Sequence, residues 1–295
     1  MRLFFILYII TGKYIFSKKW RKLKMWNNDT KLKAISDTNR RKEQYAIQIA
    51  KSIEISEIAE YKNTDTVKPR YSNTEIELVQ LGSDEAVYTE FKNSNGGRVA
   101  VLNFASFKNP GGGYIRGAMA QEEALCHAST LYNILASEKF RYDYYFENTS
   151  NLNSGKYSNR HIYVKDVVFE LHNKVIYPVD VITCAAPNKS FAFKSNNKQL
   201  LLELDTVMEN RIDQVLYSAY VHNVDILILG AFGCGVFKNN PEVVARSFNE
   251  LLQSKYKNVF SKVVFAIPSG KQSAGFKAVA DKNLLTFMRH IETTK

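Results

Sequence analysis

Two adjacent glutamates follow a run of three glycines in the stretch NFASFKNPGGGYIRGAMAQEE, residues 103–123. The glycines, Gly111 to Gly113, come after an apolar segment. Glycine permits backbone conformations closed to other residues and has no Cβ to hold a ligand away. Seven residues separate Gly113 from Gln121, Glu122 and Glu123, which stand at the start of a predicted helix. The chemistry that such a carboxyl pair offers is proton transfer to a leaving oxygen.

The position of these glutamates also has a simpler explanation, because an acidic side chain at a helix N-terminus interacts favourably with the helix dipole. The dipole favours the ionised carboxylate, so a glutamate acting there as a general acid needs a neighbour that raises its pKa. A bound diphosphate would do so through like charge and desolvation. Side chains at adjacent helix positions point about 100° apart, and we therefore expect only one of Glu122 and Glu123 to face a given bond.

A second glycine-rich stretch, GAFGCGVFKNNPE at residues 230–242, follows another apolar segment. Gly233 and Gly235 predict a loop that a ligand can approach closely, and Asn240 and Pro241 suit a helix N-cap and first turn. A strand, a glycine loop and a helix N-terminus together can bind an anion through backbone N–H groups. The stretch matches neither a Walker loop nor a G-x-G-x-x-G dinucleotide loop. A tight turn that binds nothing is the alternative.

The elements that position these loops alternate between strands and helices along the chain. Continuously apolar runs predict buried strands, and apolar residues at helical spacing predict amphipathic helices. We therefore expect an α/β fold of one main domain, with a mixed or parallel sheet covered on both faces. The predicted helices span residues 29–58, 121–135, 199–220, 241–256 and 276–291, the strands 76–81, 98–106, 162–171, 178–187, 224–231 and 263–269, and a loop 141–158.

The composition excludes several classes of protein. With 45% hydrophobic and 23% charged residues over 295 positions, the chain is an ordinary globular sequence rather than a disordered or repetitive one. Its three cysteines, Cys126, Cys184 and Cys234, have no C-x-x-C spacing, which excludes a disulfide scaffold and points to a reducing compartment. No histidine lies near Cys234 in sequence, so we expect a small packed residue rather than a nucleophile. The five histidines lack metal-ligand spacing, and we expect neither metal nor cofactor.

Most of the positive charge lies at the N-terminus. Of the formal net charge of +11, residues 1–24 contribute seven basic and no acidic residues, beginning with a short apolar run at 3–10. This leader admits three interpretations: a weak signal segment, an arm that contacts a membrane surface weakly, or an extension outside the functional domain. We therefore divide the chain into an extension, residues 1–28, and a catalytic domain, 29–295. Because the charge is not spread along the folded part, we expect no direct nucleic-acid binding.

Together the two glycine loops suit a ligand that carries a diphosphate and a scissile sugar bond. PGGG followed by QEE resembles the signature of microbial-type poly(ADP-ribose) glycohydrolases, and GAFGCGVFKN resembles their diphosphate loop. RHIYVKDVVF and VITCAAPN are similar to their middle strands, so the resemblance covers about residues 35–292. It implies a macrodomain-like fold with N-terminal accessory helices that binds ADP-ribose and hydrolyses the ribose–ribose O-glycosidic bond without a metal.

The resemblance also implies roles for individual residues. Glu123 is the expected general acid that protonates the leaving oxygen, and Glu122 holds the neighbouring ribose or orients the substrate. Phe237 is expected to place its ring against the ribose. With the substrate's diphosphate near the forming oxocarbenium-like centre, one glutamate suffices and water completes hydrolysis. The expected substrate-binding residues are Asn109, Gly111, Gly112, Gly113, Gln121, Gly233, Cys234, Gly235, Val236 and Phe237.

Other functions remain open at this point. A non-catalytic ADP-ribose reader needs the glycine loops but has no use for Glu123, and a hydrolase of single ADP-ribose units would keep both. The adenine-contacting residues and the contribution of the 141–158 segment are not assigned. We expect an intracellular, cytoplasmic monomer that acts on poly(ADP-ribose) or on ADP-ribosylated macromolecules.

Overall fold

The computed structural model describes residues 28–61, 66–269 and 274–294, so the predicted leader lies outside the described residues except for its last position. Seven strands form one mixed sheet in the order β1-β4-β5-β3-β6-β7-β2. β5, β3, β6, β7 and β2 run parallel, whereas β4 is antiparallel to both β1 and β5. The strands are β1 (Glu57–Ala59), β2 (Glu75–Val79), β3 (Val99–Phe104), β4 (His161–Leu171), β5 (Lys174–Cys184), β6 (Ile226–Leu229) and β7 (Lys262–Ala266).

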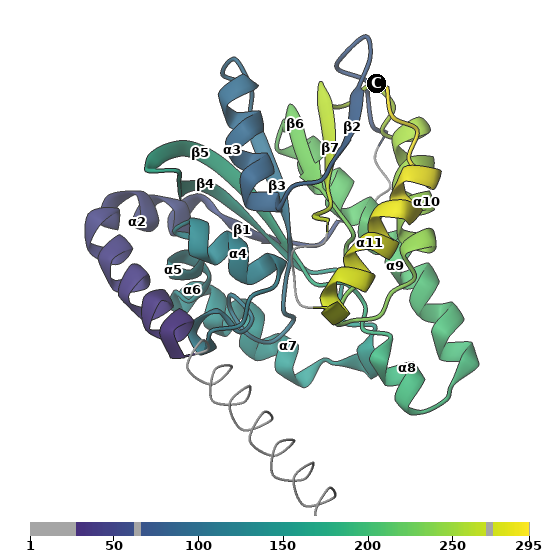
Figure 1. The fold of residues 1–295 in the computed structure, drawn as a ribbon, viewed down its shortest axis with the longest axis horizontal. Coiled ribbons are helices and arrows are strands. Elements are labelled where there is room, and N and C mark those ends of the chain that lie inside the picture. Colours follow the sequence, from purple (N-terminus) through teal and green to yellow (C-terminus); the bar gives the residue numbers. More distant parts are fainter. Residues whose placement is uncertain (1–27, 62–65, 270–273, 295) are drawn as a thin grey trace, which may run out of the picture.

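The sheet separates two hydrophobic cores, because successive side chains of a strand point to opposite faces. In β3, Val99 and Val101 belong to one core, and Ala100 and Leu102 to the other. Figure 1 shows α2, α4 and α5 on one side of the sheet and α9, α10 and α11 on the other. The predicted α/β class with a sheet covered on both faces is confirmed. The α-helices are residues 28–44, α2 (Ala46–Ile55), α3 (Ser83–Asn93), α4 (Gln121–Ala128), α5 (Leu131–Leu135), α6 (Glu138–Phe140), α7 (Glu147–Ser150), α8 (Ser190–Lys194), α9 (Lys198–Val221), α10 (Pro241–Gln253) and α11 (Ala274–His290).

The helix predicted over 121–135 is two helices. Ser129 interrupts it: its hydroxyl donates to the carbonyl of Leu125 and accepts from the N–H of Leu131, at 2.6 and 3.1 Å. The N–H of Thr130 donates to Val168 of β4 instead of continuing the helix. Such hydrogen bonds from serine and threonine compete with helical ones.

The prediction of a loop over 141–158 was wrong, because this segment is mostly helical. It contains the π-helix η2 (Arg141–Phe146), α7 and the 3₁₀-helix η3 (Asn153–Gly155). Its composition of Asn, Ser and Tyr favours a loop, but burial overrides that preference. Tyr144 and Tyr145 are buried, and the Asn148 side chain donates to the carbonyl of Phe107 at 2.9 Å.

The helix at residues 28–44 is attached to the domain. The Tyr114 hydroxyl donates to the carbonyl of Ala34 at 3.1 Å, and Arg41 is buried. No helix in the described part of the chain combines the length and apolar character needed to cross a bilayer.

We predict that deletion of residues 1–28 leaves folding and catalysis by the purified domain intact, since no predicted site residue precedes Asn109. A deletion to residue 44 is the control, because it removes Arg41 and should prevent folding. Circular dichroism melting and ADP-ribose release check both deletion variants. Loss of folding or activity in the shorter deletion would place the domain boundary further toward the N-terminus.

Candidate active site

The two glycine loops lie at the same edge of the sheet. One follows the carboxyl end of β3 and the other that of β6, and these strands are parallel neighbours. In open parallel sheets this edge is where ligands bind. The rings of Phe104 and Phe232 are 5.7 Å apart and so connect the two loops.

Both ends of α4, the helix that carries the glutamates, are fixed by side chains. At its start, the Gln121 amide accepts from the N–H of Phe104 and donates to the Leu102 carbonyl and the Ser83 hydroxyl, at 2.8, 2.8 and 3.0 Å. At its end, the Arg41 guanidinium donates to the carbonyls of Cys126, His127 and Ser129. A cation there also complements the helix dipole. These contacts hold α4 in place relative to β3.

Glu122 is buried beneath the first glycine loop. One carboxyl oxygen accepts the backbone N–H of Ser106 at 2.7 Å, and the other lies 3.4 Å from the Asn103 side-chain nitrogen. Burial raises the pKa of Glu122 to about 8, and the neighbouring Glu123 adds to the rise. This pKa favours the protonated form of Glu122 at neutral pH.

Glu123 is buried too, and each of its carboxyl oxygens accepts one backbone N–H. It accepts the N–H of Gly113 at 2.7 Å and that of Ala120, the N-cap of α4, at 2.9 Å. The first bond attaches the glycine loop to the helix N-terminus. The second is the helix-capping interaction that an acidic residue makes in the first turn.

Both glutamates point at the same residue, Gly112. A Cβ at Gly112 would lie 2.6 Å from an oxygen of Glu123 and 2.7 Å from an oxygen of Glu122. The backbone there has φ of +59°, and Gly111 before it has +61°. The loop therefore folds over the N-terminus of α4 and meets both side chains; which of the two glutamates faces the scissile bond stays a prediction.

The second loop presents a row of backbone donors. Among the described residues, no partner accepts the N–H groups of Gly235, Val236 or Phe237. Gly235 is exposed, and a Cβ there would meet nothing within 4 Å. Gly233 differs, since it has φ of +70° and its Cβ would lie 2.5 Å from that of Ala186. Gly233 therefore shapes the turn, whereas Gly235 leaves room above it, as an anion-binding loop requires.

A cluster of three aromatic rings joins this loop to the first. Phe107 stacks on Tyr157 with centroids 4.1 Å apart, and Tyr157 meets Phe237 edge-on at 6.1 Å. Phe107 precedes the glycines, and Tyr157 belongs to the segment whose contribution was not assigned. No pattern in the sequence pairs these rings, because the contact joins three separate loops.

The remaining predicted residues lie around the same edge. Asn109 is exposed, its N–H donating to Ser106, and Val236 is 76% exposed beside the row of donors. Cys234 is buried, and burial raises the pKa of its thiol, which suits a packed residue and not a nucleophile. The Gln121 amide is occupied within the protein, which indicates a positioning role. The contacts of all these residues with substrate remain predictions.

We predict that Gly235→Val weakens ADP-ribose binding by about tenfold or more without lowering the melting temperature. The backbone at Gly235 is not strained, but the new side chain would fill the space above the donors, and one lost charge-assisted hydrogen bond to phosphate costs about 1.5–3 kcal/mol. Calorimetric titration checks the affinity. Gly233→Ala should show the opposite pattern, a large loss of stability. A normal dissociation constant for a folded Gly235→Val variant would remove this loop from the site.

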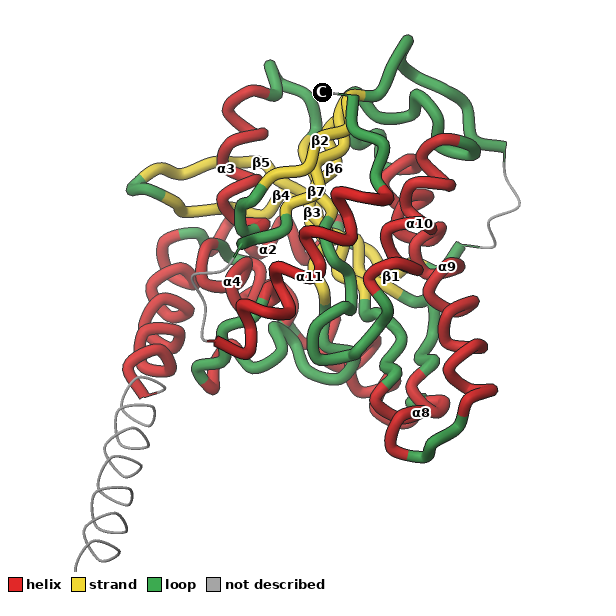
Figure 2. The backbone as a smooth tube through the Cα atoms, turned by 45° about the vertical axis from the view of Figure 1, so that its right-hand side comes forward, coloured by secondary structure: helices red, strands yellow, loops and turns green. Residues whose placement is uncertain are grey.

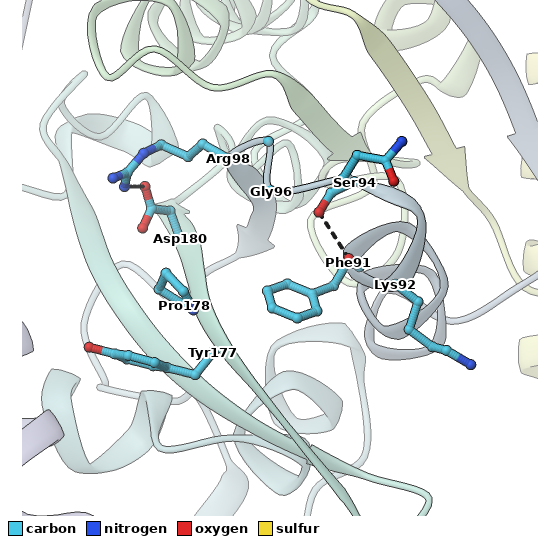
Figure 3. Close-up of a pocket in the computed structure, with 10 residues that line it drawn as sticks. Phe91, Lys92, Ser94, Gly96, Arg98, Tyr177, Pro178 and Asp180 are labelled. Atoms are coloured by element: carbon cyan, nitrogen blue, oxygen red, sulfur yellow. Dashed lines mark hydrogen bonds and ion pairs between the residues drawn. The ribbon is translucent and has the colours of Figure 1, made fainter.

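A pocket of about 430 Å³ lies elsewhere, at the amino end of β3. Figure 3 shows Arg98 and Asp180, which are joined by an ion pair of 2.7 Å, beside Pro178, Tyr177 and Phe91. None of the predicted site residues lines it. Within the described residues, no group of three or more His, Cys, Asp and Glu side chains is placed to hold a metal ion.

Comparisons with known proteins identify the family of this chain. The catalytic-domain model of microbial-type PARG matches residues 28–170. The structure of poly(ADP-ribose) glycohydrolase (PARG) from Deinococcus radiodurans in complex with ADP-ribose is 30% identical, with a TM-score of 0.69, and the match covers 83% of this chain and 97% of that one. The chain belongs to the microbial-type PARG family. A comparison with curated proteins finds no match.

A second PARG has the same fold. The enzyme from Thermomonospora curvata is 26% identical with a TM-score of 0.75, covering 90% of this chain and all of that one. The same enzyme bound to the inhibitor ADP-HPD is 28% identical with a TM-score of 0.69, covering 86% and 99%. The predicted resemblance to microbial-type PARG is thus confirmed. The structural matches extend over most of the chain.

Proposed function

We propose that this protein is a poly(ADP-ribose) glycohydrolase that binds ADP-ribose and hydrolyses ribose–ribose O-glycosidic bonds. The observation that carries the proposal is the convergence of Glu122 and Glu123 on Gly112, beside a loop with three N–H groups that no described residue accepts. An ADP-ribose reader needs such a loop but has no need of two buried carboxyl groups, whose burial costs stability. The pair favours an enzyme over a reader.

In the proposed mechanism the N–H groups of residues 235–237 bind the diphosphate. This places the distal ribose at Gly112, where its anomeric carbon faces the glutamates. Glu123 protonates the leaving oxygen of the next ribose as the glycosidic bond breaks. The diphosphate supplies negative charge near the oxocarbenium-like centre, and Glu123, now a carboxylate, accepts a proton from the attacking water.

Glu122 has a separate role in this mechanism. Because its pKa is about 8, it enters the reaction as a neutral carboxyl group at neutral pH. A neutral carboxyl can both donate and accept a hydrogen bond, which suits it to hold a ribose hydroxyl. It also spares the buried site a second negative charge next to Glu123.

The test is incubation of the purified protein with poly(ADP-ribose) and, separately, with mono-ADP-ribosylated protein, with free ADP-ribose measured by chromatography. We expect ADP-ribose from the polymer. Release from the mono-ADP-ribosylated protein alone would assign the activity to single units. Binding of ADP-ribose with no release from either would make the protein a reader.

A further inference from the structure

An arginine lies directly beside the carboxyl pair. Arg116, at the end of the 3₁₀-helix η1 (Tyr114–Arg116), donates to the carbonyl of Gly112 at 3.1 Å. Gly112 is the residue on which Glu122 and Glu123 converge, and the Arg116 side chain is exposed at the same place. The mechanism proposed above does not use this positive charge.

The charge lies on the side of the glutamates away from the diphosphate loop. η1 contacts α4, and its first residue, Tyr114, donates a hydrogen bond to Ala34 of the helix at residues 28–44. The diphosphate loop lies with α8 and η3, since the N–H of Lys189 donates to the carbonyl of Phe237. Figures 1 and 2 show α8 on one side of the molecule and α4 with the helix at residues 28–44 toward the other. A substrate with its terminal diphosphate on the loop must extend its leaving unit toward η1.

A second arginine borders the same side. Arg141, at the start of η2, is exposed, and its guanidinium has no hydrogen bond or ion pair within the part of the chain that the structure describes. The ring of Tyr132 packs against Gly111. Burial raises the pKa of the Tyr132 hydroxyl, and the positive charges of Arg141 and Arg116 oppose part of this rise. Asp143 is the acidic neighbour of Arg141 on η2 and reduces the local positive charge without cancelling it.

The leaving unit of poly(ADP-ribose) carries phosphate close to the bond that breaks. The ribose that bears the leaving oxygen is esterified at its own 5′ carbon to a diphosphate, so an anion follows one sugar ring after the reacting centre. We propose that Arg116 binds the phosphate of this leaving unit and forms a subsite specific for polymer. The inference rests on the proposed function and concerns the part of the substrate beyond the cleaved bond. A guanidinium suits it, because its planar donors match phosphate oxygens.

The test compares two substrates that differ only beyond the scissile bond. One is poly(ADP-ribose), and the other is an aryl glycoside of ADP-ribose whose leaving group is a neutral phenol. For Arg116→Gln we expect KM for the polymer to rise about tenfold more than KM for the aryl glycoside, because the loss of one charge-assisted hydrogen bond to phosphate costs about that much affinity. Arg116→Lys should recover part of the loss, since it keeps the charge. Added salt should raise the wild-type KM for polymer more than that of Arg116→Gln.

Arg246→Gln on α10 is the matched control, because Arg246 is exposed, carries the same charge and lies away from η1. It should leave both KM values unchanged. Equal increases of KM for both substrates in Arg116→Gln would overturn the proposed subsite. Arg116 would then support the glycine loop instead. An unchanged KM on both would overturn it as well. If the wild-type protein released ADP-ribose from neither substrate, the proposed function itself would fail, which the wild-type arm shows directly.

Discussion

Replacement of Glu123 by glutamine is expected to abolish release of ADP-ribose while leaving the dissociation constant of ADP-ribose within a few-fold of wild type. Glutamine keeps one of the two oxygens that accept the N–H groups of Gly113 and Ala120, places an amide NH2 at the position of the other, and cannot donate an acidic proton. General acid catalysis contributes about 10²–10⁴-fold to a rate, so kcat should fall by at least that much. Single-turnover release of ADP-ribose together with calorimetric titration measures both quantities.

Glu122→Gln is the matched variant for this prediction. The neutral glutamine side chain resembles the protonated Glu122 of the ligand-free protein, so its loss of kcat should be smaller and KM should carry part of the effect. A greater loss of kcat in Glu122→Gln than in Glu123→Gln would exchange the two roles and make the residue with the raised pKa the acid. Near wild-type turnover by Glu123→Gln would exclude it as the proton donor.

Gly112→Ala is the second change with a large expected effect. The new Cβ would lie within 2.7 Å of both carboxyl groups, so the loop or the glutamates must move, and alanine at φ of +59° is itself strained. Because a displacement of about 1 Å can cost 10²-fold in rate, we expect kcat/KM for poly(ADP-ribose) to fall at least that far. A melting curve and a steady-state assay measure the two effects separately.

Gly96→Ala is the control for backbone strain. Gly96 has φ of +87°, and a Cβ there meets nothing within 4 Å. It lies at the pocket of Figure 3, at the amino end of β3. Its alanine variant should lose about 1–2 kcal/mol of stability and keep full activity. If Gly112→Ala were as active as Gly96→Ala, the carboxyl groups would not need their observed positions.

The sequence predicts the parts of the site that are continuous along the chain. PGGG and QEE identify Gly112 and both glutamates, and the apolar runs locate the strands before each glycine loop, because these signals depend on composition and periodicity within a few residues. The types of most predicted elements follow for the same reason. The exceptions are the 141–158 segment, where buried tyrosines decide the structure, and the end of the 29–58 helix, where β1 forms; α3 and α8 were not predicted.

The rest depends on contacts between distant segments. The convergence of both glutamates requires left-handed backbone at Gly111 and Gly112, which no spacing rule specifies. Arg41 reaches the end of α4 from 85 residues away, and the ring of Tyr157 joins two loops that follow different strands. The raised pKa of Glu122 comes from burial, and burial is a property of the assembled fold.

A crystal structure of the Glu123→Gln variant with ADP-ribose tests most directly whether the two glycine loops form one site. We predict diphosphate oxygens within hydrogen-bond distance of the N–H groups of residues 235–237, and the anomeric carbon of the distal ribose next to Gly112 and the side chain at position 123. ADP-ribose bound in the pocket between Arg98 and Asp180, with both glycine loops empty, would contradict the account.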